Sequence, residues 1–228
     1  KIHYRFADWM EDLRWTFSAK AQSVFGQLGC LPGRAIAIRR ELLQQIVDDS
    51  YVHEAVIGDD RAITVRLQKL GYKTFYQATG TVYTRYPEGW WEFLRQQLRW
   101  ARSSQYYTLK NLKLYLTKCR MAGFVFITDI LTPLGLMFIL VWAAINAITH
   151  FYPCLVIQGT PLATTLGIPI GVAGMASAMG VKWIPHLRKN KRDLLILPLF
   201  ALFLTLVLTP IRVLGLLTCY KTREWLSR

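Results

Sequence analysis

The feature that most constrains this chain is a stretch of about 60 residues between Arg120 and Lys182 in which Asp129 is the only Asp, Glu, Lys or Arg. It contains apolar runs at 121–148 and 161–181. Each is near or above the ~20 residues that a helix needs to cross a bilayer. Lys and Arg cluster before the first run and after the second, while the loop between the runs has neither. The positive-inside rule therefore predicts a multi-pass plasma-membrane protein with both flanks in the cytoplasm.

The net charge of +14 accompanies a hydrophobic content of 53%. A charge of this size is also typical of nucleic-acid-binding proteins, but here it gathers around the apolar runs. We therefore expect the lipid bilayer as a partner and no nucleic acid. Cys30, Cys119, Cys154 and Cys219 show no paired spacing, so a disulfide framework is not expected.

Helices and strands are expected to alternate in the polar region of the chain. Apolar spacing predicts helices at 5–28, at 60–70 with a glycine cap, and at 88–109. A short strand is expected at 35–38, and alternation over 73–87 predicts one or two more. This pattern predicts an α/β fold, the C-terminal half of an open-sheet domain, followed by transmembrane helices.

A third apolar run, 194–217, is open to two interpretations. Its length favours a membrane span, whereas Pro198, Pro210 and Arg212 favour a broken helix at the membrane interface.

The motif GDDR at 58–61 carries adjacent acids, Asp59 and Asp60, at the head of a helix. Acids in this position complement the helix dipole. A carboxylate in a cleft is also suited to act as a general base toward a sugar hydroxyl. Both interpretations stay open from these residues alone.

The motif QxxRW places Gln96, Arg99 and Trp100 at i, i+3 and i+4, so one helix face presents all three. Arg offers paired donors for a phosphate, and Trp offers a flat face for a sugar ring. An amphipathic helix rich in Arg and Trp before membrane spans is equally suited to lie on the bilayer surface.

Two shorter motifs complete the pattern. GCLPG at 29–33 predicts a tight turn that brings backbone close to a ligand, or an ordinary turn before a strand. WLSR at 225–228 is typical of an aromatic and basic flank of a membrane segment.

The order GCLPG, GDDR, QxxRW, membrane spans and WLSR resembles the processive family 2 membrane glycosyltransferases, which include hyaluronan, chitin, cellulose and nodulation-type chitooligosaccharide synthases. The hyaluronan synthase branch looks most similar. The resemblance implies the C-terminal half of a GT-A-type domain in an inverting hexosyltransferase. UDP-sugar donors and a growing β-linked polysaccharide would be its partners.

The resemblance also implies a role for each motif residue. Asp60 would be the general base and Asp59 would support it. Trp100 would form the floor of the acceptor site. The remaining acceptor residues would be Cys30, Leu31, Pro32 and Gly33. The UDP-binding residues would be Gln96, Arg99, Trp225, Ser227 and Arg228.

Two departures from the family matter. The family's gating loop reads W-G-T-R, and this chain has Leu226 and Ser227 in place of the Gly and the Thr. The family also binds Mg²⁺ (or Mn²⁺) through a D-x-D motif, and this chain has none. The chain begins with Lys and has no signal peptide, so we expect a fragment, inactive alone, whose metal-binding residues lie outside it.

The resulting organisation has five segments. They are a cytoplasmic glycosyltransferase region at 1–86, amphipathic helices at 87–120, two membrane helices at 121–184, a basic turn and interfacial broken helix at 185–217, and a gating segment at 218–228. Asp129, Thr128 and Trp142 are candidates to line a polymer channel, although Asp129 is equally interpreted as an acid held between helices.

Three functions stay open. The first is a hyaluronan-type synthase that uses UDP-GlcNAc and UDP-GlcA. The second is a chitin or chitooligosaccharide synthase that uses UDP-GlcNAc alone. The third is a non-catalytic membrane scaffold that binds anionic lipid.

Overall fold

A computed structural model describes residues 2–47, 52, 58–154, 183–184 and 186–221. The chain divides into two compact units, and each is described by itself. The first comprises Lys1–Leu131 and Ile211–Arg228, and the second comprises Thr132–Pro210.

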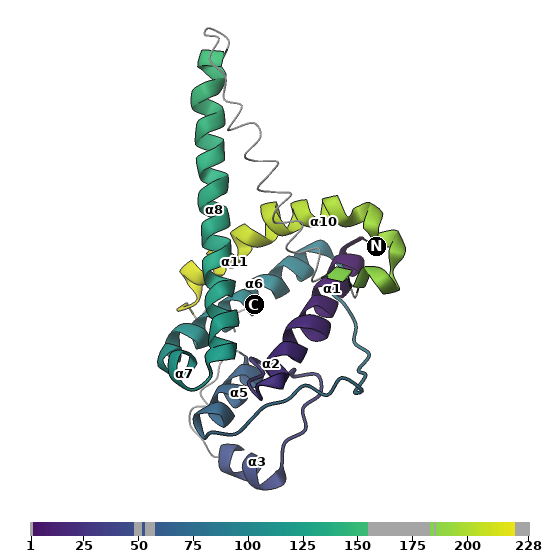
Figure 1. Ribbon diagram of the computed structural model, residues 1–228, viewed down its shortest axis with the longest axis vertical. Coiled ribbons are helices and arrows are strands. Elements are labelled where there is room, and N and C mark those ends of the chain that lie inside the picture. Colours follow the sequence, from purple (N-terminus) through teal and green to yellow (C-terminus); the bar gives the residue numbers. More distant parts are fainter. Residues whose placement is uncertain (1, 48–51, 53–57, 155–182, 185, 222–228) are drawn as a thin grey trace. The chain divides into compact units, whose positions relative to one another are not determined.

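The first unit opens with one continuous helical rod (Figure 1). It consists of α1 (Ile2–Asp12), the π-helical segment η1 (Leu13–Ala19) and α2 (Lys20–Val24). The rod ends at Gly26, whose φ of 64° is a left-handed conformation that glycine adopts without steric cost. The helix expected at 5–28 is thus confirmed, although it ends earlier.

Helix α5 (Asp59–Lys69) confirms the helix expected at 60–70 and its glycine cap. Gly71 has a φ of 87°. Its N–H donates to the carbonyl of Gln68, and the N–H of Tyr72 donates to that of Leu67. These two bonds form a Schellman motif, which satisfies the last carbonyls of the helix.

Two hydrophobic clusters flank α5 and fix its position. One contains Ala62, Val65, Tyr107, Leu114, Tyr115, Cys119, Ala122 and Phe126. The other contains Ala19, Leu28, Leu31, Ile46 and Leu67. Because α5 contributes side chains to both clusters, its N-terminus and the Asp59–Asp60 pair are held by packing on two sides.

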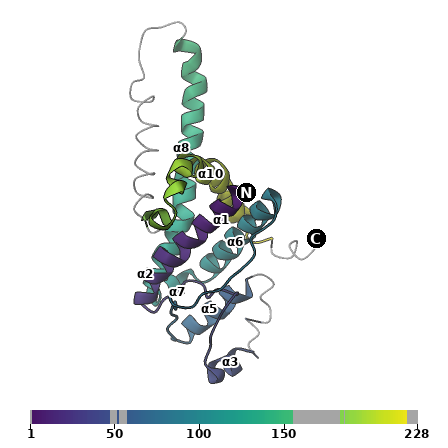
Figure 2. The ribbon, with the colours of Figure 1, turned by 90° about the vertical axis from the view of Figure 1, so that its right-hand side faces the viewer.

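Three further helices follow in the first unit. Helix α6 (Trp90–Lys110) confirms the helix expected at 88–109 and packs beside α5 (Figure 2). It is followed by α7 (Leu112–Thr117) and α8 (Arg120–Cys154), and α8 continues into the second unit. The side chain of Gln27 caps α8, because its Oε1 accepts the N–H of Met121 at 2.9 Å.

The expected strands at 35–38 and within 73–87 are wrong. Helix α3 (Arg40–Val47) follows a loop, and the described residues contain only an isolated parallel bridge between Gln27 and Thr74. Alternation favours an extended backbone, but a strand also needs a neighbour to complete its hydrogen-bond ladder. The described residues supply no such neighbour. The α/β class is therefore not confirmed.

Two helical stretches are long and apolar enough to cross a membrane by length and composition, Arg120–Trp142 and Lys191–Thr218. The first agrees with the run at 121–148. The run at 161–181 lies outside the described residues. The division into five segments and the interfacial placement of 194–217 stay predictions.

The stretch that includes 194–217 is helical but irregular. It comprises the 3₁₀ segment η2 (Lys191–Ile196), α10 (Leu197–Phe203), the π segment η3 (Leu204–Leu208) and α11 (Thr209–Thr218). Within the second unit, His186 Nε2 lies 2.9 Å from Asp193 Oδ2, and both residues are buried.

The portion of α11 within the first unit packs against α6. Gln105 Nε2 donates to the carbonyl of Arg212 at 2.9 Å, and Arg102 Nε donates to Thr218 Oγ1 at 2.7 Å. A Cβ added at Gly215 would lie 2.8 Å from that of Ala101, so glycine permits this close approach. Hydrogen bonds therefore hold one side of the helix that carries QxxRW against α11.

Candidate active site

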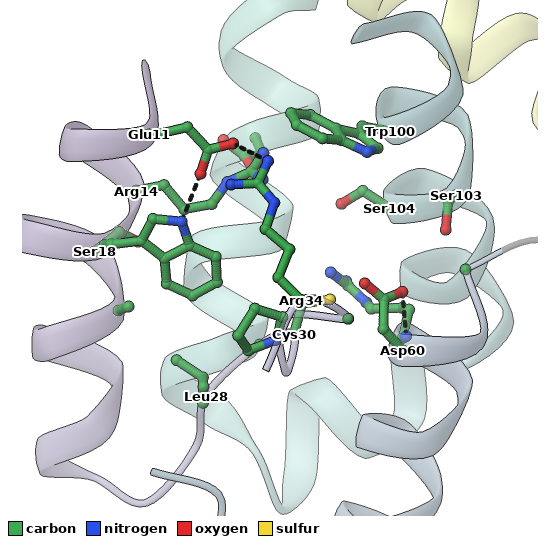
Figure 3. Close-up of a pocket in the computed structure, with 18 of the residues that line it drawn as sticks. Glu11, Arg14, Ser18, Leu28, Cys30, Arg34, Asp60, Trp100, Ser103 and Ser104 are labelled. Atoms are coloured by element: carbon green, nitrogen blue, oxygen red, sulfur yellow. Dashed lines mark hydrogen bonds and ion pairs between the residues drawn. The ribbon is translucent and has the colours of Figure 1, made fainter. Parts of the chain in front are cut away.

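A cavity of about 630 Å³ in the first unit joins the three described motifs (Figure 3). Its walls come from η1, the turn at 29–33, the start of α5, helix α6 and the beginning of α8. The sequence-predicted residues that line it are Cys30, Pro32, Gly33, Asp59, Asp60, Gln96, Arg99, Trp100 and Asp129. A cavity of this size is in the range of sites that hold small polar ligands.

The acidic pair lies at the N-terminus of α5. Gly58 precedes it with a φ of 67°, and Asp60 Oδ1 accepts the N–H of Arg61 at 2.7 Å. The same N–H also donates to the carbonyl of Gly58 at 2.9 Å, and a carboxylate in the first turn complements the helix dipole. The other oxygen, Oδ2, lies 3.6 Å from the position that a Cβ at Gly33 would occupy. Asp60 therefore lies in the first turn of α5 and borders the GCLPG turn.

The GCLPG turn is held at its start. The N–H of Gly29 donates to Gln22 Oε1 at 2.6 Å, and Gln22 Nε2 donates to Ser18 Oγ at 2.9 Å. A Cβ at Gly29 would overlap the ring of Phe126, so only glycine fits beneath it. The close approach of the GCLPG turn to Phe126 of α8 therefore explains why Gly29 is a glycine.

Thr64 joins this turn to the first turn of α5. Its side chain has no exposed surface. The hydroxyl accepts the N–H of Leu31 at 2.9 Å and donates to the carbonyl of Asp60 at 2.7 Å. One buried hydroxyl therefore fixes the GCLPG turn against the turn that contains Asp60.

The arginine of GDDR lies beneath the acidic pair as a buried cation. Arg61 is only 5% exposed, its Nη2 donates to Thr108 Oγ1 at 3.3 Å, and its Cζ lies 3.7 Å from the centroid of the Phe126 ring. Its Nε has no hydrogen-bond partner among the described residues. The aromatic ring and the nearby Asp60 compensate the cost of burying this charge.

Helix α6 supplies the opposite wall. Gln96 and Trp100 are half-buried and Arg99 is exposed, and all three side chains line the cavity as their spacing predicts. Ser103, one turn further on, touches the GDDR turn, because a Cβ at Gly58 would overlap Ser103 Oγ. The GDDR turn is therefore in direct contact with the helix that carries QxxRW.

The wall formed by α1 and η1 was not predicted. Glu11 Oε2 accepts Trp15 Nε1 at 2.6 Å, and Glu11 Oε1 accepts Arg34 Nη2 at 3.0 Å, as the dashed lines in Figure 3 show. The Cζ of Arg14 lies 4.8 Å from the centroid of the Trp100 ring. The sequence does carry a signal for this wall, because charged residues and Trp occur together over 11–15 within a helical pattern. π-Helical turns are frequent at functional sites.

The thiol of Cys30 is neutral in this environment. Burial raises its pKa to about 11, the neighbouring Asp60 carboxylate adds to the rise, and the Arg61 cation opposes it. The thiolate is the nucleophilic form of cysteine, so Cys30 is a poor nucleophile at neutral pH. Cys30 therefore lines the cavity as a neutral thiol.

Other predicted residues lie elsewhere. The side chain of Leu31 is buried in the hydrophobic core, so Leu31 contributes only its backbone to the surface of the GCLPG turn. Thr128 donates to carbonyls of its own helix and is not among the residues that line the cavity. Trp142, in the second unit, is 60% exposed and stacks on Phe138. Trp225, Ser227 and Arg228 lie outside the described residues.

Asp129 lines the cavity and has a partner. Arg212 Nη1 donates to Asp129 Oδ1 at 3.3 Å, so the lone acid of one apolar run pairs with the lone base of another. Both side chains are substantially exposed, so the ion pair has access to the cavity.

The described residues of the cavity do not form a divalent-cation site. No group of three carboxylate, His or Cys ligands converges there, and Glu11 and Asp129 already pair with Arg34 and Arg212. Mg²⁺ prefers several oxygen ligands in octahedral geometry, which this arrangement does not offer. Metal binding therefore stays a prediction about residues outside the chain.

Sequence comparisons with known proteins show the family of this chain. An N-acetylglucosaminyltransferase of Azorhizobium caulinodans is 30% identical over 216 residues, 91% of this chain and 50% of that protein. Human hyaluronan synthase 3 is 39% identical over 88 residues, 36% of this chain and 16% of the synthase. No solved structure matches significantly. The chain spans about half the length of the Azorhizobium relative.

The family model described as glycosyl transferase family group 2 matches residues 1–164 of the 228. The match includes the GCLPG turn, the acidic pair, QxxRW and the first apolar helix, so it covers all the residues that line the cavity. Because it covers more than half of the chain, this protein belongs to glycosyl transferase family group 2.

Proposed function

We propose that the chain is the acceptor-binding portion of a processive membrane glycosyltransferase that joins UDP-sugars into a β-linked polysaccharide and exports it. The observation that carries the proposal is the single cavity in which GCLPG, GDDR and QxxRW meet. These motifs are far apart in sequence, and the bonds of Thr64 and the contact of Ser103 fix them together.

Asp60 acts as the general base in this proposal. Its carboxylate takes the proton of an acceptor hydroxyl while that oxygen forms a bond to the anomeric carbon of the donor sugar. The bond from that carbon to the UDP oxygen breaks, its electron pair leaves with UDP, and the configuration inverts. Asp59 supports Asp60 in this role, and the N-terminus of α5 favours the negative charge of both carboxylates.

The remaining residues bind the two substrates. Gln96 and Arg99 donate to the diphosphate, where a guanidinium offers charge-assisted bonds as UDP leaves. Trp100 supplies the floor on which the acceptor ring stacks. Cys30 to Gly33 hold the acceptor end beside Asp60, and Trp225, Ser227 and Arg228 close over UDP.

Asp129 lines the cavity on an otherwise apolar helix, and Arg212 of a second apolar run donates to it at 3.3 Å. A hydrated polymer needs polar or aromatic lining to cross hydrocarbon. The paired side chains supply such lining without an isolated charge, which supports Asp129 as a channel residue.

Two substrate assignments follow from the relatives. Similarity to hyaluronan synthases favours alternating use of UDP-GlcNAc and UDP-GlcA. The relative that aligns over 91% of the chain is an N-acetylglucosaminyltransferase, which favours a chitooligosaccharide-type synthase that uses UDP-GlcNAc alone.

The test is the product made by membranes that contain the full-length parent protein with Mg²⁺. Each donor is supplied alone and then both together, and the polymer is identified by digestion with hyaluronidase or chitinase. Polymer formed only with both donors and cut by hyaluronidase identifies the first activity. A chitinase-sensitive product from UDP-GlcNAc alone identifies the second. Absence of polymer under every condition contradicts the proposal and favours a non-catalytic scaffold.

A further inference from the structure

Arg14 occupies a place in the cavity that no motif assigns. Its guanidinium carbon lies 4.8 Å from the centroid of the Trp100 ring, and both side chains line the cavity. Figure 3 shows Arg14 on the helix that faces Trp100 across the cavity. The residue belongs to the π-helical segment η1, one turn from Glu11 on the same rod.

Arg14 is not paired with the described carboxylates nearby. Glu11 accepts hydrogen bonds from Trp15 and Arg34, at 2.6 and 3.0 Å. Asp60 Oδ1 accepts the N–H of the following residue. Among the described residues no carboxylate forms an ion pair with Arg14, whose side chain is exposed to the cavity. Its donors are therefore available to a ligand.

The chemistry of this pair fits an acidic sugar. An indole face stacks on a sugar ring whether or not the sugar carries a charge. A guanidinium adds a planar set of donors that matches a carboxylate, and this match distinguishes a charged sugar from a neutral one. A neutral acceptor would give the guanidinium of Arg14 no carboxylate with which to form an ion pair.

We propose that Arg14 and Trp100 form an acceptor subsite for a hexuronate, in which Trp100 stacks on the ring and Arg14 binds the carboxylate. Arg14 is then the residue that determines acceptor specificity. This inference rests on the proposed function, because it concerns the same site. It favours the polymer that contains an acidic sugar over the polymer of N-acetylglucosamine alone.

A different role for Arg14 would give a different result. A guanidinium stacked on an indole also fixes the orientation of the ring. If that were its only task, its loss would weaken acidic and neutral acceptors equally. A residue that binds the carboxylate affects the acidic acceptor selectively.

The experiment measures single-sugar transfer by the full-length parent protein in lipid nanodiscs. Two soluble oligosaccharide acceptors are compared, one ending in glucuronate and one ending in N-acetylglucosamine, each with the donor that it requires. The variants are Arg14→Gln, which removes the charge, and Arg14→Lys, which keeps the charge without the planar donor set. Lys20→Gln is the matched control, because it removes an exposed charge from the same rod away from the cavity.

We expect Arg14→Gln to lower kcat/KM for the glucuronate-ended acceptor by roughly 10- to 100-fold, from the loss of charge-assisted hydrogen bonds. The other acceptor should change by less than about 3-fold, Arg14→Lys should be intermediate, and Lys20→Gln should match wild type. Equal losses with both acceptors, or no loss, would overturn the inference. So would a wild-type protein that extends only the N-acetylglucosamine-ended acceptor, although the proposed function would then survive. A wild-type protein that extends neither acceptor would contradict the proposed function itself.

Discussion

Replacement of Gly58 by alanine tests the contact between the GDDR turn and the QxxRW helix. Gly58 has a φ of 67°, and a Cβ there would overlap Ser103 Oγ and lie 3.3 Å from Ser103 Cβ. The left-handed backbone costs an alanine ~1–2 kcal/mol, and overpacking costs a further ~1–3 kcal/mol. We therefore expect Gly58→Ala to lower the free energy of unfolding by about 2–5 kcal/mol.

A second substitution separates the two costs. Ser103→Ala removes the overlapping oxygen, so the double variant should recover the overpacking cost of about 1–3 kcal/mol and keep the backbone cost. Ser104 is the matched control, because it follows Ser103 in the same helix and also lines the cavity. None of the atoms nearest to a Cβ at Gly58 belongs to Ser104. Gly58→Ala combined with Ser104→Ala should show no such recovery.

The assay is the thermal unfolding midpoint of the purified full-length protein in detergent, and the readout is the difference between the midpoints of the matched variants. UDP release by the same samples reports whether Asp60 keeps its place. If Ser103→Ala gives no more recovery than Ser104→Ala, the two motifs are not in contact and the geometry of the cavity is wrong.

Three further predictions test other bonds of the site. Thr64→Val should destabilise the protein by about 1–3 kcal/mol and slow UDP release, because it breaks the bonds to Leu31 and Asp60, whereas Thr64→Ser should keep most of both. For the exposed Asp129–Arg212 pair, a double-mutant cycle with Asp129→Asn and Arg212→Gln should give a coupling energy of only about 0.2–1 kcal/mol, and strictly additive effects on the unfolding midpoint would show that the pair does not form. Because the pKa of Cys30 is raised to about 11, its thiolate fraction should still increase with pH up to that value. Iodoacetamide labelling of Cys30, followed by peptide mass spectrometry, should therefore keep accelerating between pH 9 and 10, and a plateau near pH 9 would contradict the raised value.

Local sequence signals predicted much of the site. Helices α5 and α6 have the expected spacing, and Gly71 ends α5 as a glycine cap should. The i, i+3, i+4 spacing of QxxRW placed three side chains on one face, and the structure turns that face to the cavity. These features depend on short-range geometry, which the sequence carries directly.

Other features depend on contacts between distant segments. Alternation over 73–87 predicted one or two strands, but the described residues provide no partner strand. The position of Arg14 over Trp100 depends on how η1 packs against α6, which no motif records. The pairing of Asp129 with Arg212 had a usable signal, because lone opposite charges in apolar helices tend to pair.

The most direct test compares UDP release by the full-length wild type with that of Asp60→Asn, at saturating UDP-GlcNAc and UDP-GlcA with Mg²⁺. Asn has the shape of Asp but cannot accept the proton, and loss of a general base slows a reaction by about 10²–10⁴-fold. We predict a fall in this range, with an unfolding midpoint close to that of wild type. Release by Asp60→Asn at the wild-type rate would contradict the role of Asp60 and the proposed mechanism.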